Sequence, residues 1–282
     1  MSNLSANTPH GLSSRNIQWS SILSLGVILI SAAIYFPPFY RALGSFVVLL
    51  IYDLCIFVSA LTGAFLAIML WRSYERGETL SQIWGGIAIG LTLWLGGELI
   101  WSSDQLWGGE SLPYPSNADI LWIIGYVPII WALLKRFRSL RIAPNQTWQK
   151  TVLIFYGLVV FLIVVYLIIP IISDTETSRV YEKTVNLLYP LGDLVVALLA
   201  IMLVLVLSGG TLFGPWRLIT IGFLLAAVSD LLYGFTVWQG TYVSDPSNGI
   251  DPLSLIINIS YVAFYVLVAL GLYQQARMQN AV

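Results

Sequence analysis

Apolar residues in this chain form eight long runs, and a short polar stretch separates each run from the next. Each run has roughly the 20 residues that an α-helix needs to cross the hydrocarbon core of a bilayer. We therefore predict an all-α, polytopic membrane protein with about eight transmembrane helices. The predicted spans cover 19–37, 45–70, 82–102, 118–134, 151–172, 185–207, 215–237 and 252–274.

The hydrophobic pattern of the first half of the chain returns in the second half. The sequence Leu-Ala-Ile-Met-Leu occupies 66–70 and again 199–203. Internal repeats of this kind are typical of duplicated membrane proteins, so we predict two four-helix repeats. Other residues match at almost the same offset: Trp84 with Trp216, Gly90 with Gly222, Glu98 with Asp230, Trp101 with Tyr233, Gly108 with Gly240 and Asp119 with Asp251.

The repeat divides the chain into two membrane units, 19–135 and 151–276, joined by a basic cytoplasmic loop at 136–150. The segment 1–18 is rich in Ser and Asn and is predicted to be a flexible cytoplasmic tail, and 277–282 a second one. A unit of four spans enters and leaves the membrane on the same side. The two units are therefore expected to be parallel, related by an axis along the membrane normal.

The composition supports a membrane protein. Hydrophobic residues make up 58% of the chain, charged residues 10%, and the mean hydropathy is +0.83. The formal net charge of -1 predicts no nucleic-acid partner. Cys55 is the only cysteine, which excludes an intrachain disulfide.

Lysine and arginine residues indicate the orientation. One side of the predicted topology holds ten of them and the other side three, so the positive-inside rule places both termini in the cytoplasm. The acidic loops at 103–117 and 238–251, which contain Glu110 and Asp245, then face outward. The ten are Arg15, Arg72, Arg76, Lys135, Arg136, Arg138, Arg141, Lys150, Arg217 and Arg277, and the three are Arg41, Arg179 and Lys183.

Four carboxylates lie within predicted spans, namely Asp53, Glu98, Asp193 and Asp230, and all four fall in the outer half of the bilayer. An ionised, unpaired acid at this depth costs roughly 2.5 kcal/mol or more. No Lys or Arg occurs at a comparable depth. Each acid must therefore be protonated, hydrogen-bonded, in contact with water, or matched by a cation from outside.

Helical spacing places Trp94, Glu98 and Trp101 on one face of the third span, and Asp230 and Tyr233 on the equivalent face of the seventh. We predict that these faces meet in an outward-open, aromatic-walled cavity that suits a small cationic or amphiphilic ligand. The predicted ligand-binding residues are Glu98, Asp230, Asp53, Asp193, Trp94, Trp101, Tyr189 and Tyr233. The alternative is that the acids are protonated and bond to polar residues of neighbouring helices, among them Asn186, Ser229, Thr236 and Asn258.

Local motifs predict helix starts and membrane anchors. Ser116 followed by Asp119 resembles a capping box, and Asp251 followed by Pro252 has N-cap and N1 chemistry. The clustered glycines of the third span favour close approach of a neighbouring helix. Tryptophans that flank span ends are expected to be interfacial anchors: Trp19, Trp71, Trp84, Trp148 and Trp216.

The stretch Pro-Ser-Asn-Ala-Asp-Ile-Leu-Trp at 115–122, with Tyr126 after it, resembles a pattern in the multispan N-terminal regions of bacterial signalling proteins. Those regions precede GGDEF diguanylate cyclase, EAL or sensor-kinase modules. Tyr189-Pro190 with Asp193, and Asp230 with Tyr233, resemble further landmarks of that family. The resemblance implies a sensory or ligand-binding membrane module. The sequence up to Val282 contains no GGDEF, EAL or kinase segment, so we expect the signal to pass to a separate partner.

The residues also argue against several kinds of site. His10 is the only histidine and lies in the predicted tail, which disfavours haem, histidine-based zinc sites and histidine-dependent catalysis. We expect no enzymatic activity and no metal site, and the sequence defines no cofactor; quinone, carotenoid and lipid remain open as ligands of the aromatic surfaces.

The preferred interpretation is a sensor or ligand-binding module of the bacterial cytoplasmic membrane. It would contact the lipid bilayer and a cytoplasmic signalling protein or membrane complex. A small-solute or cation transporter and a scaffold subunit of a membrane complex are the alternatives.

Overall fold

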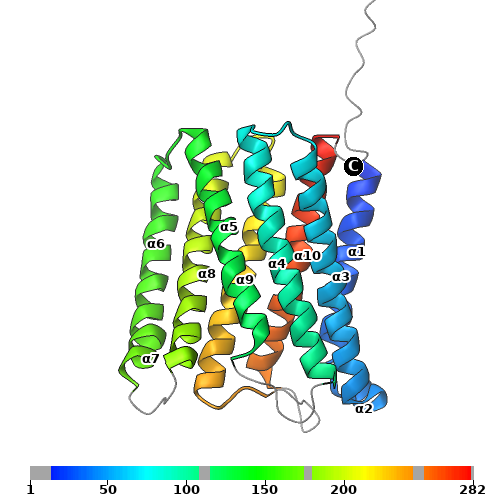
Figure 1. Cartoon of the computed structure of the whole chain (residues 1–282). Coiled ribbons are helices and arrows are strands. Elements are labelled where there is room, and N and C mark those ends of the chain that lie inside the picture. The colour runs from blue at the N-terminus through cyan, green and yellow to red at the C-terminus, as the bar shows by residue number, and fades with distance from the viewer. Residues whose placement is uncertain (1–13, 108–114, 175–179, 244–250, 281–282) are drawn as a thin grey trace, which may run out of the picture.

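The chain folds into a bundle of long, roughly parallel helices, seen from the side in the computed structural model of Figure 1. The structure describes residues 14–107, 115–174, 180–243 and 251–280, and these contain helices and turns but no strand. This confirms the prediction of an all-α polytopic protein. The helices are α1 (Ser14–Ala33), α2 (Pro37–Leu43), α3 (Ser45–Arg72), α4 (Thr79–Trp107), α5 (Asn117–Leu140), α6 (Thr147–Ile163), the π-helical turn η1 (Val164–Ile168), α7 (Ile169–Ser173), α8 (Val180–Leu207), α9 (Phe213–Trp238) and α10 (Pro252–Met278).

Within the described residues, seven helical segments are long and apolar enough to cross a membrane, counting α6, η1 and α7 as one. An eighth span is formed if α1 and α2 are taken together, although they meet at an angle of 80°. The first predicted span, 19–37, is therefore wrong at its end. Pro37 begins α2, and a proline disfavours the helical conformation of the residue before it, so α1 stops at Ala33.

Six helices form a closed ring. Their packing follows the order α3, α4, α5, α8, α9, α10 and returns to α3. Helix α1 packs outside the ring against α10 and α3, and α6 packs outside it against α8. The start of α1 and the end of α10 lie at one end of the bundle, called here the terminal end, while α2 lies at the other, called the α2 end (Figure 1).

The ring has the symmetry expected of a parallel repeat. Exchanging the two halves maps α3, α4 and α5 onto α8, α9 and α10, and every contact of the ring maps onto another contact of the ring. In particular, the contact of α5 with α8 becomes the contact of α10 with α3. The matched residues Trp84 and Trp216 meet across the centre, with ring centroids 5.8 Å apart.

The prediction that Trp84 and Trp216 are interfacial anchors is wrong. The two side chains are only 2% and 1% exposed. Both lie near a helix end in the sequence, but the face on which they sit points to the centre of the ring. Trp19, Trp71 and Trp148 are exposed, as anchors would be.

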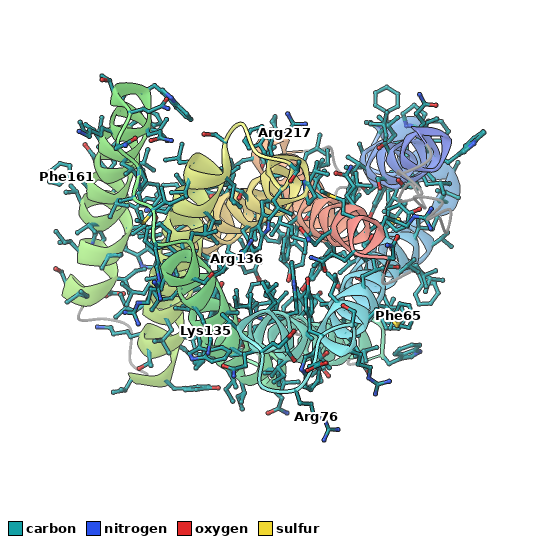
Figure 2. All side chains as sticks on the ribbon, turned by 90° about the horizontal axis from the view of Figure 1, so that it is seen from above. Phe65, Arg76, Lys135, Arg136, Phe161 and Arg217 are labelled. Atoms are coloured by element: carbon teal, nitrogen blue, oxygen red, sulfur yellow. The ribbon has the colours of Figure 1, made fainter. Side chains whose placement is uncertain are left out.

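Large apolar side chains cover the outside of the bundle. Phe65 of α3 and Phe161 of α6 point away from the helices in Figure 2, and both are more than half exposed. An apolar exterior of this extent fits a lipid bilayer and identifies a multi-pass membrane protein. Figure 2 views the terminal end, where Arg76, Lys135, Arg136 and Arg217 lie.

Several predicted boundaries differ from the structure. Helix α5 continues to Leu140 and α6 begins at Thr147, so the connection between the repeats covers 141–146 instead of 136–150. Helix α1 begins at Ser14, inside the predicted tail 1–18, and α10 extends to Met278, inside the predicted tail 277–282. Residues 1–13 and 281–282 of these tails, together with His10, Gly108, Glu110, Arg179 and Asp245, lie outside the described residues.

Gly90 of α4 shows why glycine is needed where α4 meets α5. A Cβ atom at this position would lie 2.3 Å from Cγ1 of Ile129 and 2.9 Å from the carbonyl oxygen of Gly125. Overpacking of this kind costs about 1–3 kcal/mol. We therefore expect the variant G90A to unfold at a lower temperature than the wild type, measured by circular dichroism in detergent.

The matched control is G157A in α6, where no atom lies within 4 Å of the added Cβ. Alanine is favoured over glycine in a helix by about 1 kcal/mol. This variant should be at least as stable as the wild type. If both variants unfold like the wild type, α4 and α5 do not pack as closely as described.

Candidate functional site

The ring encloses a cavity of about 400 Å³ in the half of the bundle nearer the α2 end. Asp53 lies in the first third of α3, which starts at the α2 end, and Glu98 lies in the last third of α4, which finishes there. The corresponding acid of α9, Asp230, lies in the last third of that helix. All three line the cavity, together with aromatic residues of α3, α4, α5, α8, α9 and α10.

The cavity lies between the two repeats. Positions that match at offsets of 132 or 133 face it from both sides, as expected for a site on the axis of a duplicated protein. These pairs are Glu98 with Asp230, Trp101 with Tyr233, Trp94 with Ala226, Asp53 with Asn186, and Tyr126 with Asn258.

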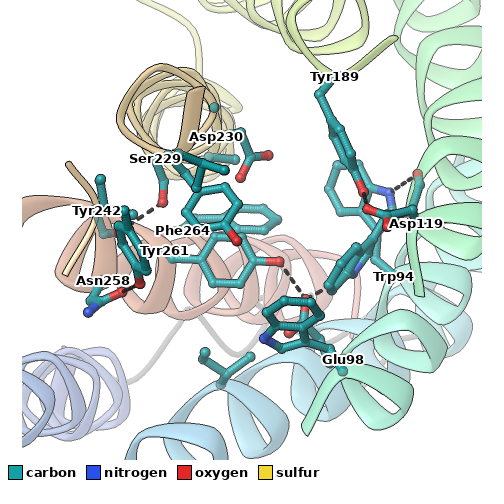
Figure 3. A pocket seen from close by; sticks show the side chains of 18 of the residues that line it. Trp94, Glu98, Asp119, Tyr189, Ser229, Asp230, Tyr242, Asn258, Tyr261 and Phe264 are labelled. Atoms are coloured by element: carbon teal, nitrogen blue, oxygen red, sulfur yellow. Dashed lines mark hydrogen bonds between the residues drawn. The ribbon is translucent and has the colours of Figure 1, made fainter. Parts of the chain in front are cut away.

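Glu98 is the most heavily hydrogen-bonded acid of the cavity. Its Oε1 accepts bonds from the hydroxyls of Tyr261 (2.6 Å) and Tyr265 (2.8 Å) and from Nε1 of Trp122 (3.1 Å). Tyr261 and Tyr265 are four residues apart, so both project from one face of α10. The bond from Tyr261 is drawn in Figure 3. Three donors directed at one oxygen stabilise a negative charge on Glu98.

Asp119 fixes the start of α5 and ties it to α8. Its Oδ2 accepts the backbone N–H of Ser116, whose own Oγ accepts the N–H of Ala118, which confirms the predicted capping box. Its Oδ1 accepts the hydroxyl of Tyr189 at 2.6 Å. Asp119 therefore combines helix capping with a place in the cavity wall.

Asp251 caps α10 as predicted. Its carboxylate accepts the backbone N–H of Ser254 at 2.8 Å and the hydroxyl of Ser254 at 3.0 Å. These bonds hold the pKa of Asp251 below its ordinary value. Asp119, the matched residue of the first repeat, lines the cavity, whereas Asp251 is not among the described residues of the cavity wall.

Asp193 lies behind the wall instead of in it. The hydroxyl of Tyr126, which does line the cavity, donates to Oδ1 of Asp193 at 2.6 Å. Tyr126 also lies beside Asp230, and the two aspartates are close enough to interact electrostatically. Oδ2 of Asp193 is buried and has no hydrogen-bond partner among the described residues.

Asp53 faces the cavity with little support from the protein. It interacts with Ser102 of α4, but its Oδ2 is buried and also has no hydrogen-bond partner in the described part of the chain. A buried carboxylate oxygen without a donor is costly. Among the carboxylate oxygens of the cavity wall, Oδ2 of Asp53 would therefore gain most from a hydrogen-bond donor or cation supplied by a ligand.

An aromatic layer closes the cavity toward the terminal end. Trp94 packs edge-on against Phe223 and Phe264, with ring centroids 6.3 Å and 5.6 Å away, and its Nε1 donates to the carbonyl of Trp122. Figure 3 shows Trp94 and Phe264 among the side chains around the acids. Toward the terminal end, Trp84 lies about three turns from Trp94 in α4, and Trp216 lies about two turns from Phe223 in α9, so the layer is backed by a packed core.

The charge of the cavity is acidic. Four ionisable carboxylates, Asp53, Glu98, Asp119 and Asp230, line it, and no Lys, Arg or His is among the described residues of its wall. The same residues provide no group of three or more His, Cys, Asp and Glu side chains suited to a metal ion. The described wall therefore combines carboxylates with aromatic rings and contains no basic side chain to pair with the carboxylates.

The structure brings together seven of the eight residues predicted for the site and places Asp193 behind them. Sequence reasoning did not assign Trp122, Tyr126, Tyr261 or Tyr265 to the site. The four-residue spacing of Tyr261 and Tyr265 was the available signal for the last two. Of the predicted packing partners, Asn186, Ser229 and Asn258 line the cavity, while Thr236 bonds to carbonyls of its own helix.

Comparison with protein-family models, with curated proteins and with solved structures finds no match to this chain. The resemblance to the membrane regions of bacterial signalling proteins therefore stays a prediction.

Replacing Glu98 by Ala removes the acceptor that Trp122, Tyr261 and Tyr265 share. A buried donor left without a partner costs about 1–3 kcal/mol. We expect E98A to lower the unfolding temperature in detergent at neutral pH. E98Q, which keeps an oxygen acceptor, is the matched control and should lose less. Equal stability of the two variants would show that cavity water replaces the carboxylate.

Proposed function

We propose that this chain is a sensor or ligand-binding module that binds a small organic cation, or the cationic head of an amphiphile, in its acidic aromatic cavity. The observation that carries the proposal is a cavity with four carboxylates and no basic side chain in its described wall. Negative charge at this depth requires compensation. A cation from outside supplies it.

The aromatic walls favour an organic cation. Trp94, Trp101, Tyr233 and Tyr261 surround the acids, and the face of an aromatic ring attracts an ammonium group. A cavity of about 400 Å³ accommodates a compact ammonium compound rather than a bare metal ion. The aromatic layer on the terminal-end side of the cavity would contact the methyl or methylene groups of such a ligand.

Helix α10 offers a way to transmit occupancy. Tyr261 and Tyr265 hold Glu98, and the same helix continues to Met278 at the terminal end. A cation that competes for Glu98 would weaken these bonds and change the position of α10. We propose that a cytoplasmic partner responds to this change, and that the protein acts without enzymatic activity of its own.

A cation transporter is the second candidate. The position of the cavity between two repeats, with a packed aromatic layer toward the terminal end, is compatible with a transporter caught in one of its states. Uptake of labelled choline into vesicles that contain the protein separates transport from binding alone. The third interpretation, a scaffold subunit of a membrane complex, rests on no particular contact of the structure.

The binding test uses choline and dimethylbutanol, in which a carbon replaces the ammonium nitrogen. Two opposite charges about 4 Å apart gain about 4 kcal/mol at an effective dielectric constant of about 20. We expect isothermal titration calorimetry of the purified protein to detect choline but not dimethylbutanol. The variant E98Q/D230N should bind choline at least about tenfold more weakly, a loss of about 1.4 kcal/mol.

The matched control for this variant is D104N/E182Q, which removes two carboxylates outside the described cavity wall near the same end of the bundle. It should bind choline like the wild type. Equal loss in both variants would indicate a general effect of net charge, and equal binding of choline and dimethylbutanol would contradict recognition of a cation.

The proposal includes an orientation in a bacterial cytoplasmic membrane with both termini in the cytoplasm. The support is the excess of Lys and Arg in the segments at the terminal end, counted from the sequence; Arg76, Lys135, Arg136 and Arg217 are labelled at that end in Figure 2. We expect an alkaline phosphatase fusion after Val282 to be inactive and one inserted in the loop near Gly109 to be active. An active C-terminal fusion would place the cavity on the cytoplasmic side.

A further inference from the structure

Three ionisable side chains from three helices meet at one side of the cavity. Tyr126 of α5 donates its hydroxyl to Asp193 of α8 and lies beside Asp230 of α9. Asp230 and Tyr126 face the cavity, whereas Asp193 is only 3% exposed. Oδ2 of Asp193 has no hydrogen-bond partner among the described residues, although it lies in a polar cluster.

Among the described residues, the titratable groups that interact with this pair are acids and phenols. Glu98 of α4 interacts with Asp230, and so do Tyr261 and Tyr265 of α10. Tyr156 of α6 lies near Asp193 and donates to the carbonyl of Leu194. The other neighbour on α8 is Tyr189, whose ring packs 6.3 Å from that of Tyr126. No basic side chain among the described residues interacts with the pair.

Asp193 and Asp230 both lie beside Tyr126 and interact with each other electrostatically. Inside an apolar bundle and without a cation, two such carboxylates repel each other strongly if both are ionised. Tyr126 can donate only one proton, and it directs that proton to Oδ1 of Asp193. A second proton shared by the carboxylates removes the repulsion and gives the partnerless Oδ2 of Asp193 a hydrogen to donate. The two carboxyl groups then titrate as one unit.

We propose that Asp193, Tyr126 and Asp230 form a proton-binding site, and that a cation entering the cavity expels this proton. This rests on the proposed binding of an organic cation. When a cation settles beside Asp230, its charge takes the place of the shared proton. The O–H bond breaks, both carboxylates become ionised, and the proton leaves through the cavity to the solution. No other bond is made or broken.

Binding of a cation and binding of the proton are then mutually exclusive, which fixes the pH dependence. Each bound cation releases about one proton, so its affinity rises with pH by up to about tenfold per pH unit while the pair is protonated. Once the pair has lost its proton, the affinity no longer depends on pH. Cation binding is thereby coupled to the proton concentration on the side to which the cavity opens.

The test is calorimetric titration of the full-length protein with choline over a range of pH, in pairs of buffers that differ in ionisation enthalpy. Heats that differ between the buffers give the number of protons released, expected to be about one per choline. Identical heats in both buffers, with choline still bound, would overturn the proton site and leave the proposed function intact. Absence of choline binding at every pH would contradict the proposed function itself.

The decisive variant is Asp193→Asn, which keeps an oxygen to accept the hydroxyl of Tyr126 and removes the second titrating carboxylate. Without its like-charged neighbour, Asp230 loses its proton at a lower pH, although its burial and Glu98 still oppose the negative charge. D193N should therefore release fewer protons per bound choline than the wild type, and bind choline more tightly than the wild type at acidic pH. A loss of folding or packing would weaken binding at every pH, so it cannot produce this result.

E98Q serves as the matched control, because Glu98 lies in the cavity wall but outside the proposed pair. It should bind choline more weakly and still release about one proton. Proton release that persists in D193N and disappears in E98Q would assign the proton to Glu98 and overturn the proposal.

Discussion

The structure depends on the cost of carboxylates inside an apolar bundle, around a cavity whose described wall has no basic side chain. Phenol, indole and backbone donors meet part of that cost: Tyr261, Tyr265 and Trp122 bind Glu98, and Ser116 and Tyr189 bind Asp119. These donors are neutral, so they stabilise a negative charge without cancelling it. The charge that remains can be cancelled only by protons or by a cation, and the acids of the cavity wall are where either would bind.

The duplication has produced a site whose two halves no longer match. The matched positions Glu98 and Asp230 are both acids, but Trp94 corresponds to Ala226, and Asp53 corresponds to Asn186. The fourth span supplies Tyr126, whereas the matching position of the eighth span holds Asn258. The large aromatic side chain of Trp94 packs against Tyr126, with ring centroids 5.3 Å apart, so the first repeat contributes most of the bulk on this side of the cavity. A symmetric frame thus holds an asymmetric cavity.

The sequence was sufficient to predict the long apolar helices, apart from the end of the first span, and the order in which the repeated helices match, because these follow from hydrophobic length and from matched positions along one chain. It was insufficient wherever a contact joins distant helices. Trp84 and Trp216 flank span ends like anchors, yet their faces turn inward and the rings meet. Asp193 has the depth of a cavity residue, but Tyr126 stands between it and the cavity. The position of a residue along its helix follows from the local sequence. The neighbours that its side chain contacts depend on how the six helices of the ring pack together.

The choice between a sensor and a transporter depends on the contact of α4 with α9 near the terminal end. Trp84 and Trp216 pack against each other there, and the layer of Trp94, Phe223 and Phe264 lies between them and the acids. Passage of a cation through the ring requires both layers to separate, which exposes buried aromatic surface and costs binding energy. A sensor needs only a small shift of α10, whose tyrosines hold Glu98 at the cavity. The two aromatic layers between the cavity and the terminal end are therefore the part of the structure that supports the proposed sensor over the proposed transporter.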